Sequence, residues 1–160
     1  KIGISWIGGH KRTRMEVRSI ALKRLISILK QDATFISLQY TNCQKEVVAF
    51  EKEYNIQINH WPEILYHEDY NETAALVANL DLVITVATSV YHLSGAMGIP
   101  TWVMTPSRPA WREGFYGDAH PWYPAVTMYR QERDSTEWEP VIEEVASNLD
   151  KLLVSIKYVE

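Results

Sequence analysis

The stretch that decides the fold of this chain of 160 residues is Leu82-Val83-Ile84-Thr85-Val86, followed directly by Ala87-Thr88-Ser89. Its nearly continuous apolar run is typical of a strand that is covered on both faces, as in a parallel sheet. Thr88 or Ser89 then begins a helix, which is predicted to end at Gly98, ahead of Pro100. A two-sided strand that leads into a helix is the building unit of a layered α/β fold.

The same alternation of short apolar runs and helical patterns extends along the whole chain. Further strands are predicted at 1–7, 34–39, 56–58, 101–104 and 126–129, and further helices at 20–31, 43–54, 72–80 and 136–154. Ser19 and Asn71 are expected to cap the helices that follow them, and Val47, Val48 and Phe50 to face the core. The pattern predicts one Rossmann-like α/β/α domain over 1–160, with three layers, a parallel sheet and an irregular segment at 105–124.

Composition excludes several classes of protein. Sixteen Lys and Arg against twenty Asp and Glu give a net charge of −4, which argues against nucleic-acid binding. No apolar stretch of about 18 residues is present, so no transmembrane segment is predicted. Cys43 is the single cysteine, which favours a reducing, cytoplasmic location and an inert thiol. Because the chain starts inside a predicted strand, with no Met and no signal peptide, we expect it to be a piece of a longer protein.

A glycine-rich basic loop follows the first predicted strand, at the sheet edge where open parallel sheets bind ligands. It contains two glycines and then five basic side chains, namely His10, Lys11, Arg12, Arg14 and Arg18. Glycines let backbone N–H groups approach a ligand, and the cations can neutralise a phosphate, although neither phosphate-binding glycine motif is present. The alternative interpretation is a solvated basic loop.

Two more loops at the same edge carry chemistry. Thr88 and Ser89 open a helix whose N-terminus favours an anion, and His92 lies one turn into it; alternatively they are only a helix cap and a core histidine. The 105–124 segment contains arginines and aromatic rings suited to a sugar or base, or to a hydrophobic cluster that fixes the loop. Its relevant residues are Arg108, Trp111, Arg112, Trp122 and Tyr123. No pattern of metal ligands is apparent, so neither a metal nor another cofactor is predicted.

Residues 80–102 closely resemble the signature of the heptosyltransferase-like glycosyltransferases of family 9, especially the versions attached to tetratricopeptide repeats. Supporting matches occur over nearly the whole chain: Ile4-Ser5-Trp6 with its basic loop, Arg18-Ser19-Ile20, Ser37-Leu38-Gln39, residues 69–76, Trp122-Tyr123-Pro124 and Arg130-Gln131.

The resemblance implies the carboxyl-terminal half of a GT-B fold, which holds a nucleoside-diphosphate sugar for inverting, metal-independent transfer. The amino-terminal acceptor half, absent from this chain, would supply the general base, and tetratricopeptide repeats are a further expected partner. The residues implied at the donor are Lys11, Arg12 and Arg14 at the diphosphate, Thr88, Ser89 and His92 at the phosphates or sugar, and Gln39 near the ribose. Trp111 and Arg112 are expected to contact the sugar or the acceptor.

The chain departs from the family pattern at two positions. Ala87 stands where the family usually has an Asp that touches the donor sugar, and Tyr40, Thr41, Asn42 and Cys43 stand where a ribose-binding Glu is usual. Two alternatives therefore stay open: a degenerate, non-catalytic nucleotide-binding or scaffolding module, and half of a GT-B-type sugar-nucleotide epimerase.

Overall fold

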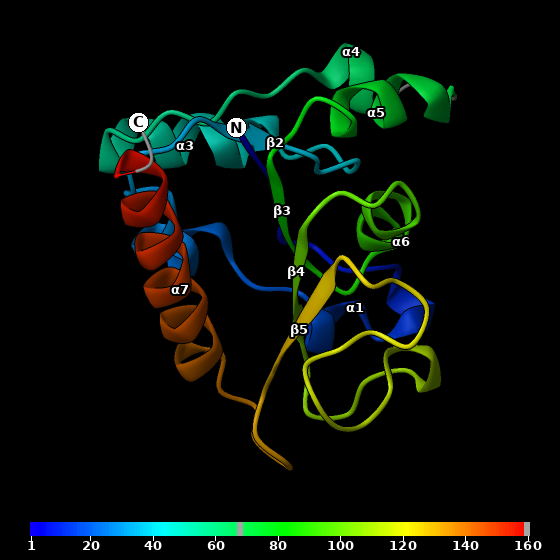
Figure 1. Ribbon diagram of the computed structural model, residues 1–160. Coiled ribbons are helices and arrows are strands. Elements are labelled where there is room, and N and C mark those ends of the chain that lie inside the picture. Colours follow the sequence, from blue (N-terminus) through cyan, green and yellow to red (C-terminus); the bar gives the residue numbers. More distant parts are fainter. Residues whose placement is uncertain (67–68, 159–160) are drawn as a thin grey trace.

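The computed structural model describes residues 1–66 and 69–158, and its centre is a parallel sheet of five strands in the order β2-β1-β3-β4-β5 (Figure 1). The strands are β1 (Ile2–Ser5), β2 (Phe35–Ser37), β3 (Leu82–Val86), β4 (Thr101–Thr105) and β5 (Val126–Arg130). In register, Ile4 of β1 lies between Ser37 and Ile84 of its two neighbours. The chain is a single Rossmann-like α/β domain, as the sequence predicts.

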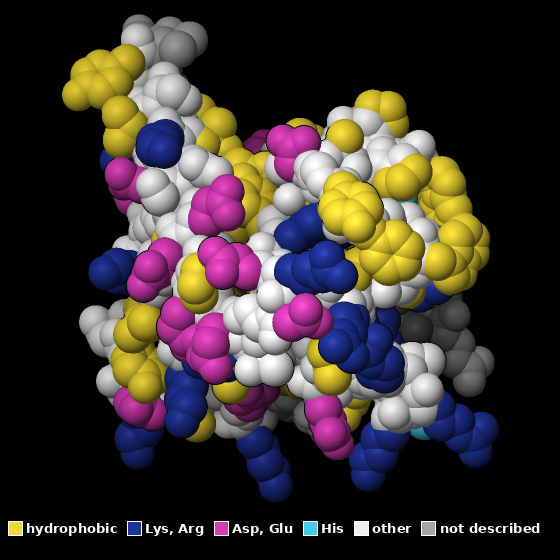
Figure 2. Space-filling view, turned by 90° about the horizontal axis from the view of Figure 1, so that it is seen from below, with side chains coloured by type: hydrophobic (Ala, Val, Ile, Leu, Met, Phe, Trp, Pro, Cys, Tyr) yellow, Lys and Arg dark blue, Asp and Glu magenta, His cyan; other side chains and the backbone are white. Residues whose placement is uncertain are grey.

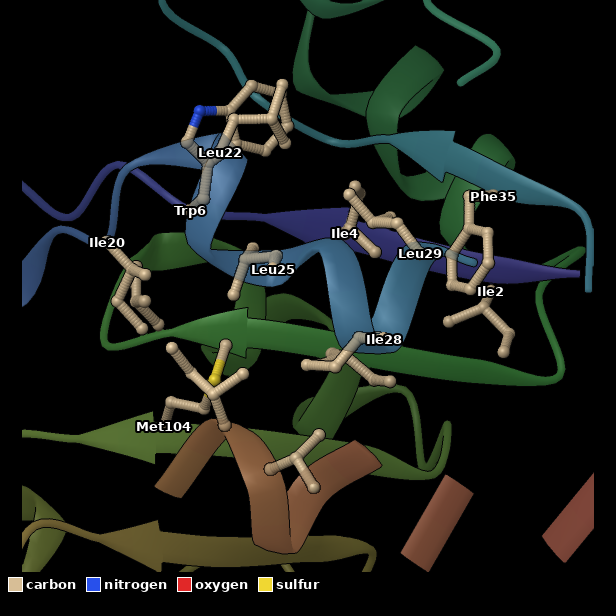
Figure 3. Packing of buried hydrophobic residues seen from close by; sticks show 14 of the residues in the cluster. Ile2, Ile4, Trp6, Ile20, Leu22, Leu25, Ile28, Leu29, Phe35 and Met104 are labelled. Carbon is tan, nitrogen blue, oxygen red and sulfur yellow. The ribbon is translucent and has the colours of Figure 1, made fainter. Parts of the chain in front are cut away.

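Alternate side chains of the strands enter two different cores. Ile2, Ile4, Ile84 and Met104 point to one face. Figure 3 shows Ile2, Ile4 and Met104 there, beside residues that follow β1. The elements that cover this face are η2 (Leu22–Leu25), α2 (Ile26–Leu29), α3 (Gln44–Tyr54) and α7 (Glu139–Lys157). This two-sided burial explains why β3 is apolar at nearly every position.

The opposite face is covered by shorter helices. Val83 and Val103 point to it from the middle of the sheet. Its covering elements are α4 (Pro62–Leu65), α5 (Tyr70–Val77) and α6 (Ser89–Ala96), with Tyr123 of the long loop after β4. The remaining short elements are η1 (Lys11–Thr13), α1 (Met15–Arg18) and η3 (Trp111–Glu113).

The predicted strand 56–58 is wrong, since these residues form no ladder. Only one bridge remains, between Ile36 and Asn59, with Ser37 N–H donating to the Asn59 carbonyl at 2.8 Å and Asn59 N–H to the Phe35 carbonyl at 3.0 Å. The segment runs alongside β2, at the outer edge of the sheet, where a strand has a partner on one side alone.

Three predictions about helices are also wrong. Ser19 does not begin a helix over 20–31; its hydroxyl donates to the Met15 carbonyl and accepts from Gly8 N–H, and the helical turns start only at Leu22. Asn71 is not the cap of α5, because the Asp69 carboxylate accepts from Asn71 N–H at 2.9 Å. Val48 is 57% exposed, since α3 turns only Val47 and Phe50 inward.

Candidate functional site

The candidate site is a pocket of about 450 Å³ at the carboxyl ends of β1 and β3. The chain leaves β1 toward β2 on one side and enters β3 on the other, so the crevice between β1 and β3 is the switch point of the sheet. Ligands of open α/β sheets bind at such points. The pocket is bounded by residues from the loops that follow β1, β2, β3 and β4: Gly9, His10, Thr13, Arg18, Tyr40, Thr41, Ala87, Thr88, Ser89, Tyr91, His92, Arg112 and Glu113.

Figure 2 looks onto this end of the molecule, from below the view of Figure 1. Lys and Arg side chains lie in the middle of the face with Asp and Glu side chains among them, beside an area of exposed hydrophobic side chains. The exposed aromatic residues of the loop after β4 include Trp111, Phe115, Tyr116 and Trp122. The face therefore offers both positive charge and aromatic surface.

Gln39 fixes the start of the loop after β1. Its fully buried side-chain carbonyl accepts from the Ser5 hydroxyl and Trp6 N–H, each at 3.2 Å, and from Ile7 N–H at 3.0 Å. Its amide donates to the Thr41 hydroxyl at 2.8 Å. Gln39 is predicted to lie near the ribose. Its own polar atoms are engaged inside the fold, and the adjacent Tyr40 and Thr41 line the pocket, so a contact of Gln39 with the ribose stays a prediction.

Gly9 makes room for a cation in the pocket. It adopts a φ of 73°, and a Cβ there would lie 1.7 Å from Nη2 of Arg18. Arg18 Nη1 donates to the Ala87 carbonyl at 3.1 Å, and Nη2 donates to the Thr13 hydroxyl at 2.7 Å. The Arg18 Nε is buried without a partner among the described residues. The loop after β1 and the loop after β3 are thus joined by one arginine that faces the pocket.

Three other basic residues of this loop lie outside the pocket wall, which His10 does line. Lys11, Arg12 and Arg14 are exposed, and Arg14 turns away to donate to the Arg108 carbonyl at 3.1 Å. It lines a neighbouring hollow of about 500 Å³ that also contains Arg24. Contact of these three side chains with a diphosphate stays a prediction, whereas Arg18 is the loop cation that the fold brings to the pocket.

The turn after β3 forms as the sequence predicts. The Thr88 hydroxyl caps α6 by accepting from Val90 N–H at 3.1 Å, and Ser89 is the first helical residue. The first turn of a helix carries N–H groups without helical partners and the positive end of the helix dipole. Ala87, Thr88 and Ser89 all line the pocket, so this positive end faces the same space as Arg18.

His92 lies on the pocket wall, one turn into α6. Its Nδ1 is 3.3 Å from the Tyr123 hydroxyl. Burial, followed by the neighbouring charge of Arg112, lowers the pKa of His92 below its ordinary value. The ring is therefore mainly neutral at pH 7, a form that can share a hydrogen bond without adding a charge.

Arg112 and Glu113 bring a charged pair from the loop after β4. Arg130 fixes this loop by donating to the carbonyls of Glu113, Gly114 and Gly117, at 2.7, 3.1 and 2.6 Å. Arg112 lines the pocket, and its contact with a sugar or acceptor stays a prediction. Trp111 does not; it is 72% exposed and lies edge-on to Trp122, with ring centroids 5.7 Å apart.

The sequence analysis missed Glu113 and Tyr91. Glu113 is 1% exposed, and its Oε1 accepts from the Tyr91 hydroxyl at 3.0 Å and lies 3.6 Å from Arg112 Nε. Burial, followed by the charge of Glu113, raises the pKa of Tyr91, so this phenol stays protonated. The one signal in the sequence is that Glu113 adjoins Arg112 in a loop already selected for its chemistry.

A second buried histidine supports this wall from behind. His120 Nδ1 accepts from Trp122 N–H at 3.1 Å, and the ring stacks on Tyr123 with centroids 4.8 Å apart. Burial lowers the pKa of His120, and its Nε2 has no partner among the described residues. His120 thereby holds the aromatic part of the loop against α6.

Cys43 lies outside this pocket wall. Its Sγ is 3.9 Å from both His60 Nε2 and the Tyr66 hydroxyl. Burial raises the pKa of the thiol, which makes the reactive thiolate scarce near neutral pH. Within residues 1–66 and 69–158, no group of three or more His, Cys, Asp or Glu side chains is arranged to hold a metal ion.

Comparisons with known proteins identify one curated relative. The chain is 33% identical over 115 residues to Protein FlbA of Caulobacter vibrioides, an alignment that covers 72% of this chain and 19% of FlbA. The chain thus spans about a fifth of the length of that relative. No protein-family description matches the chain, and no solved structure matches it. No helix in the described part of the chain is long and apolar enough to cross a membrane.

Proposed function

We propose that this domain binds a nucleoside-diphosphate sugar and is the donor-binding half of an inverting, metal-independent glycosyltransferase of the heptosyltransferase type. The observation that carries the proposal is the joint placement of Arg18 and the start of α6 at the switch point of the sheet. Both offer positive charge and N–H donors to the same pocket, which suits a diphosphate.

The proposed chemistry uses these groups in place of a metal. As the bond between the sugar and the diphosphate breaks, negative charge grows on the departing diphosphate. Donors that are already aimed at that charge stabilise the transition state. Arg18 is held in place by Ala87 and Thr13, so it needs no rearrangement to act. We therefore expect a chelator to leave nucleotide binding unchanged.

The general base is expected in an amino-terminal half, so this domain alone should bind the donor without transferring the sugar. We further propose that the parent protein contains tetratricopeptide repeats and lies in a reducing, cytoplasmic compartment. The buried, unpaired Cys43 is compatible with such a compartment.

A second candidate is a non-catalytic nucleotide-binding module. Ala87 favours it, because the methyl group cannot accept a hydrogen bond from a donor sugar. The two candidates share the diphosphate site and differ in whether a parent protein that contains both halves transfers sugar.

The test is calorimetric titration of the domain with ADP, UDP and GDP, with the variant Arg18→Gln and the control Lys52→Gln. We expect at least one nucleotide to bind, and Arg18→Gln to weaken it by about 10- to 100-fold, the range for a hydrogen bond to a charged group. Lys52→Gln removes an equal charge from the exposed side of α3, away from the pocket wall, and should change the affinity by no more than about twofold. No binding of any nucleotide at millimolar concentration would refute the proposal.

A further inference from the structure

Glu113 is a buried carboxylate in a pocket wall with too few hydrogen-bond donors of its own. It is 1% exposed and lines the pocket beside Tyr91 and Arg112. Its Oε1 accepts one hydrogen bond, from the Tyr91 hydroxyl at 3.0 Å. Its Oε2 is buried and has no partner among the described residues.

The neighbouring arginines do not complete this carboxylate. Arg112 Nε is 3.6 Å from Oε1, beyond the distance of a good hydrogen bond. Arg130 donates to the backbone carbonyl of Glu113 and not to its carboxylate. An ionised carboxylate has about four lone-pair positions and is costly to bury when they stay unfilled. The fold therefore holds an acceptor in place for a donor that the chain itself does not supply.

The pocket is the space from which a donor could reach Glu113. Glu113 and the positive groups, Arg18 and the start of α6, line the same space. Only part of the Arg112 side chain, 36%, is exposed, and a ligand phosphate would offer it a better partner than its distant contact with Glu113. An Arg112 side chain turned toward that phosphate would leave the carboxylate to a group that donates hydrogen bonds.

We infer that Glu113 determines the specificity of this pocket for the sugar, by accepting hydrogen bonds from sugar hydroxyl groups of a nucleoside-diphosphate sugar whose phosphates lie at Arg18 and α6. This inference rests on the proposed function. It makes the Glu113 carboxylate the hydrogen-bond acceptor for the sugar hydroxyl groups, a role that the methyl group of Ala87 cannot perform. Tyr91 is then a positioning residue that orients this carboxylate.

The test compares a bare nucleotide with its sugar ester in the wild type and in Glu113→Gln. The probes are ADP, UDP and GDP with ADP-glucose, UDP-glucose and GDP-glucose, each titrated by calorimetry. We expect Glu113→Gln to reduce the ratio of the sugar-ester affinity to the bare-nucleotide affinity by about tenfold or more, as for a lost hydrogen bond to a charged group. The bare nucleotide should bind no more weakly, since the variant removes a negative charge. The control Glu143→Gln, on the exposed side of α7, should leave the ratio unchanged.

A second measurement uses the wild type alone, which keeps the test decisive even where Glu113→Gln does not fold. Glucose esters in which one hydroxyl at a time is replaced by fluorine retain their shape but cannot donate at that position. At least one of them should bind about tenfold more weakly than the parent ester. Nucleotide binding with an unchanged ratio, or with equal affinity for every fluorinated ester, overturns the role of Glu113 and leaves the proposed function intact. No binding of any nucleotide overturns both.

Discussion

Replacing Gln39 by Met tests whether this side chain holds the loop after β1 or reads a ribose. Met has a similar length but cannot accept the hydrogen bonds that Trp6 N–H and Ile7 N–H donate to Gln39, at 3.2 and 3.0 Å. Trp6 is fully buried and Ile7 is partly buried, so water replaces these bonds poorly. Each of the two unsatisfied backbone donors costs about 1–3 kcal/mol, which gives a loss of about 2–6 kcal/mol of unfolding free energy.

The assay is urea unfolding followed by far-ultraviolet circular dichroism, together with thermal melts. In a domain of this size the expected loss corresponds to a melting temperature lower by roughly 4–24 °C. Gln57→Met is the matched control, because Gln57 is exposed, and it should stay within about 0.5 kcal/mol of the wild type. A loss below about 1 kcal/mol for Gln39→Met would refute the structural role.

Nucleotide binding separates the two roles further. A residue that positions the loop should weaken ADP and 2′-deoxy-ADP by the same factor when it is replaced, since Arg18 moves with the loop. A ribose contact would instead reduce the preference for ADP over its deoxy form. A change in the ratio of the affinities for ADP and 2′-deoxy-ADP, at unchanged stability, would support a contact of Gln39 with the ribose.

Two further predictions concern acid stability and the loop after β3. Because burial lowers the pKa of His60, His92 and His120, the unfolded chain binds more protons, and stability should fall as the pH drops from about 7 through the unfolded pKa near 6.5. His120→Asn keeps an acceptor for Trp122 N–H and should reduce the fall in melting temperature between pH 7 and pH 5; an unchanged fall would contradict the assignment. Ala87→Asp adds a hydrogen-bond acceptor to the pocket and should raise the affinity for a nucleotide sugar relative to that for its bare diphosphate, which should not bind more tightly. Titration with both ligands gives the ratio of the two affinities. A constant ratio would show that position 87 does not face the sugar.

The elements that the sequence predicts well are those whose local and tertiary requirements agree. β3 is apolar because both of its faces are covered, and Thr88 both ends the strand region and caps α6. The predicted strand 56–58 is wrong because this segment lies at the outer edge of the sheet and is joined to β2 by the bridge at Asn59 and not by a ladder. The helix predicted from Ser19 fails because that hydroxyl serves the loop after β1, a contact between segments that no local pattern records.

The local sequence also does not predict which basic side chain of the glycine-rich loop reaches the pocket. Lys11, Arg12, Arg14 and Arg18 carry the same charge, and all follow the two glycines. The direction of each side chain depends on two backbone positions with positive φ, 73° at Gly9 and 60° at Arg14. These turn Arg18 back to the Ala87 carbonyl and leave Lys11 exposed. A count of charges predicts that a cation is present, but only the turn geometry decides which one reaches the pocket.

The pocket has two ends of opposite character, and this restricts its ligands more than its size does. Arg18 and the start of α6 favour an anion, whereas the Glu113 carboxylate disfavours an anion and needs a hydrogen-bond donor. Inorganic phosphate satisfies only the first end, and a neutral sugar satisfies only the second. A ligand that joins a diphosphate to a group rich in hydroxyls can contact both ends at once. Its two parts lose their translational and rotational freedom in a single binding event, so this entropic cost arises once and not twice. Affinity for such a conjugate should therefore exceed that for either part, and equal affinities for the conjugate and the bare diphosphate would mean that the two ends do not act on one ligand.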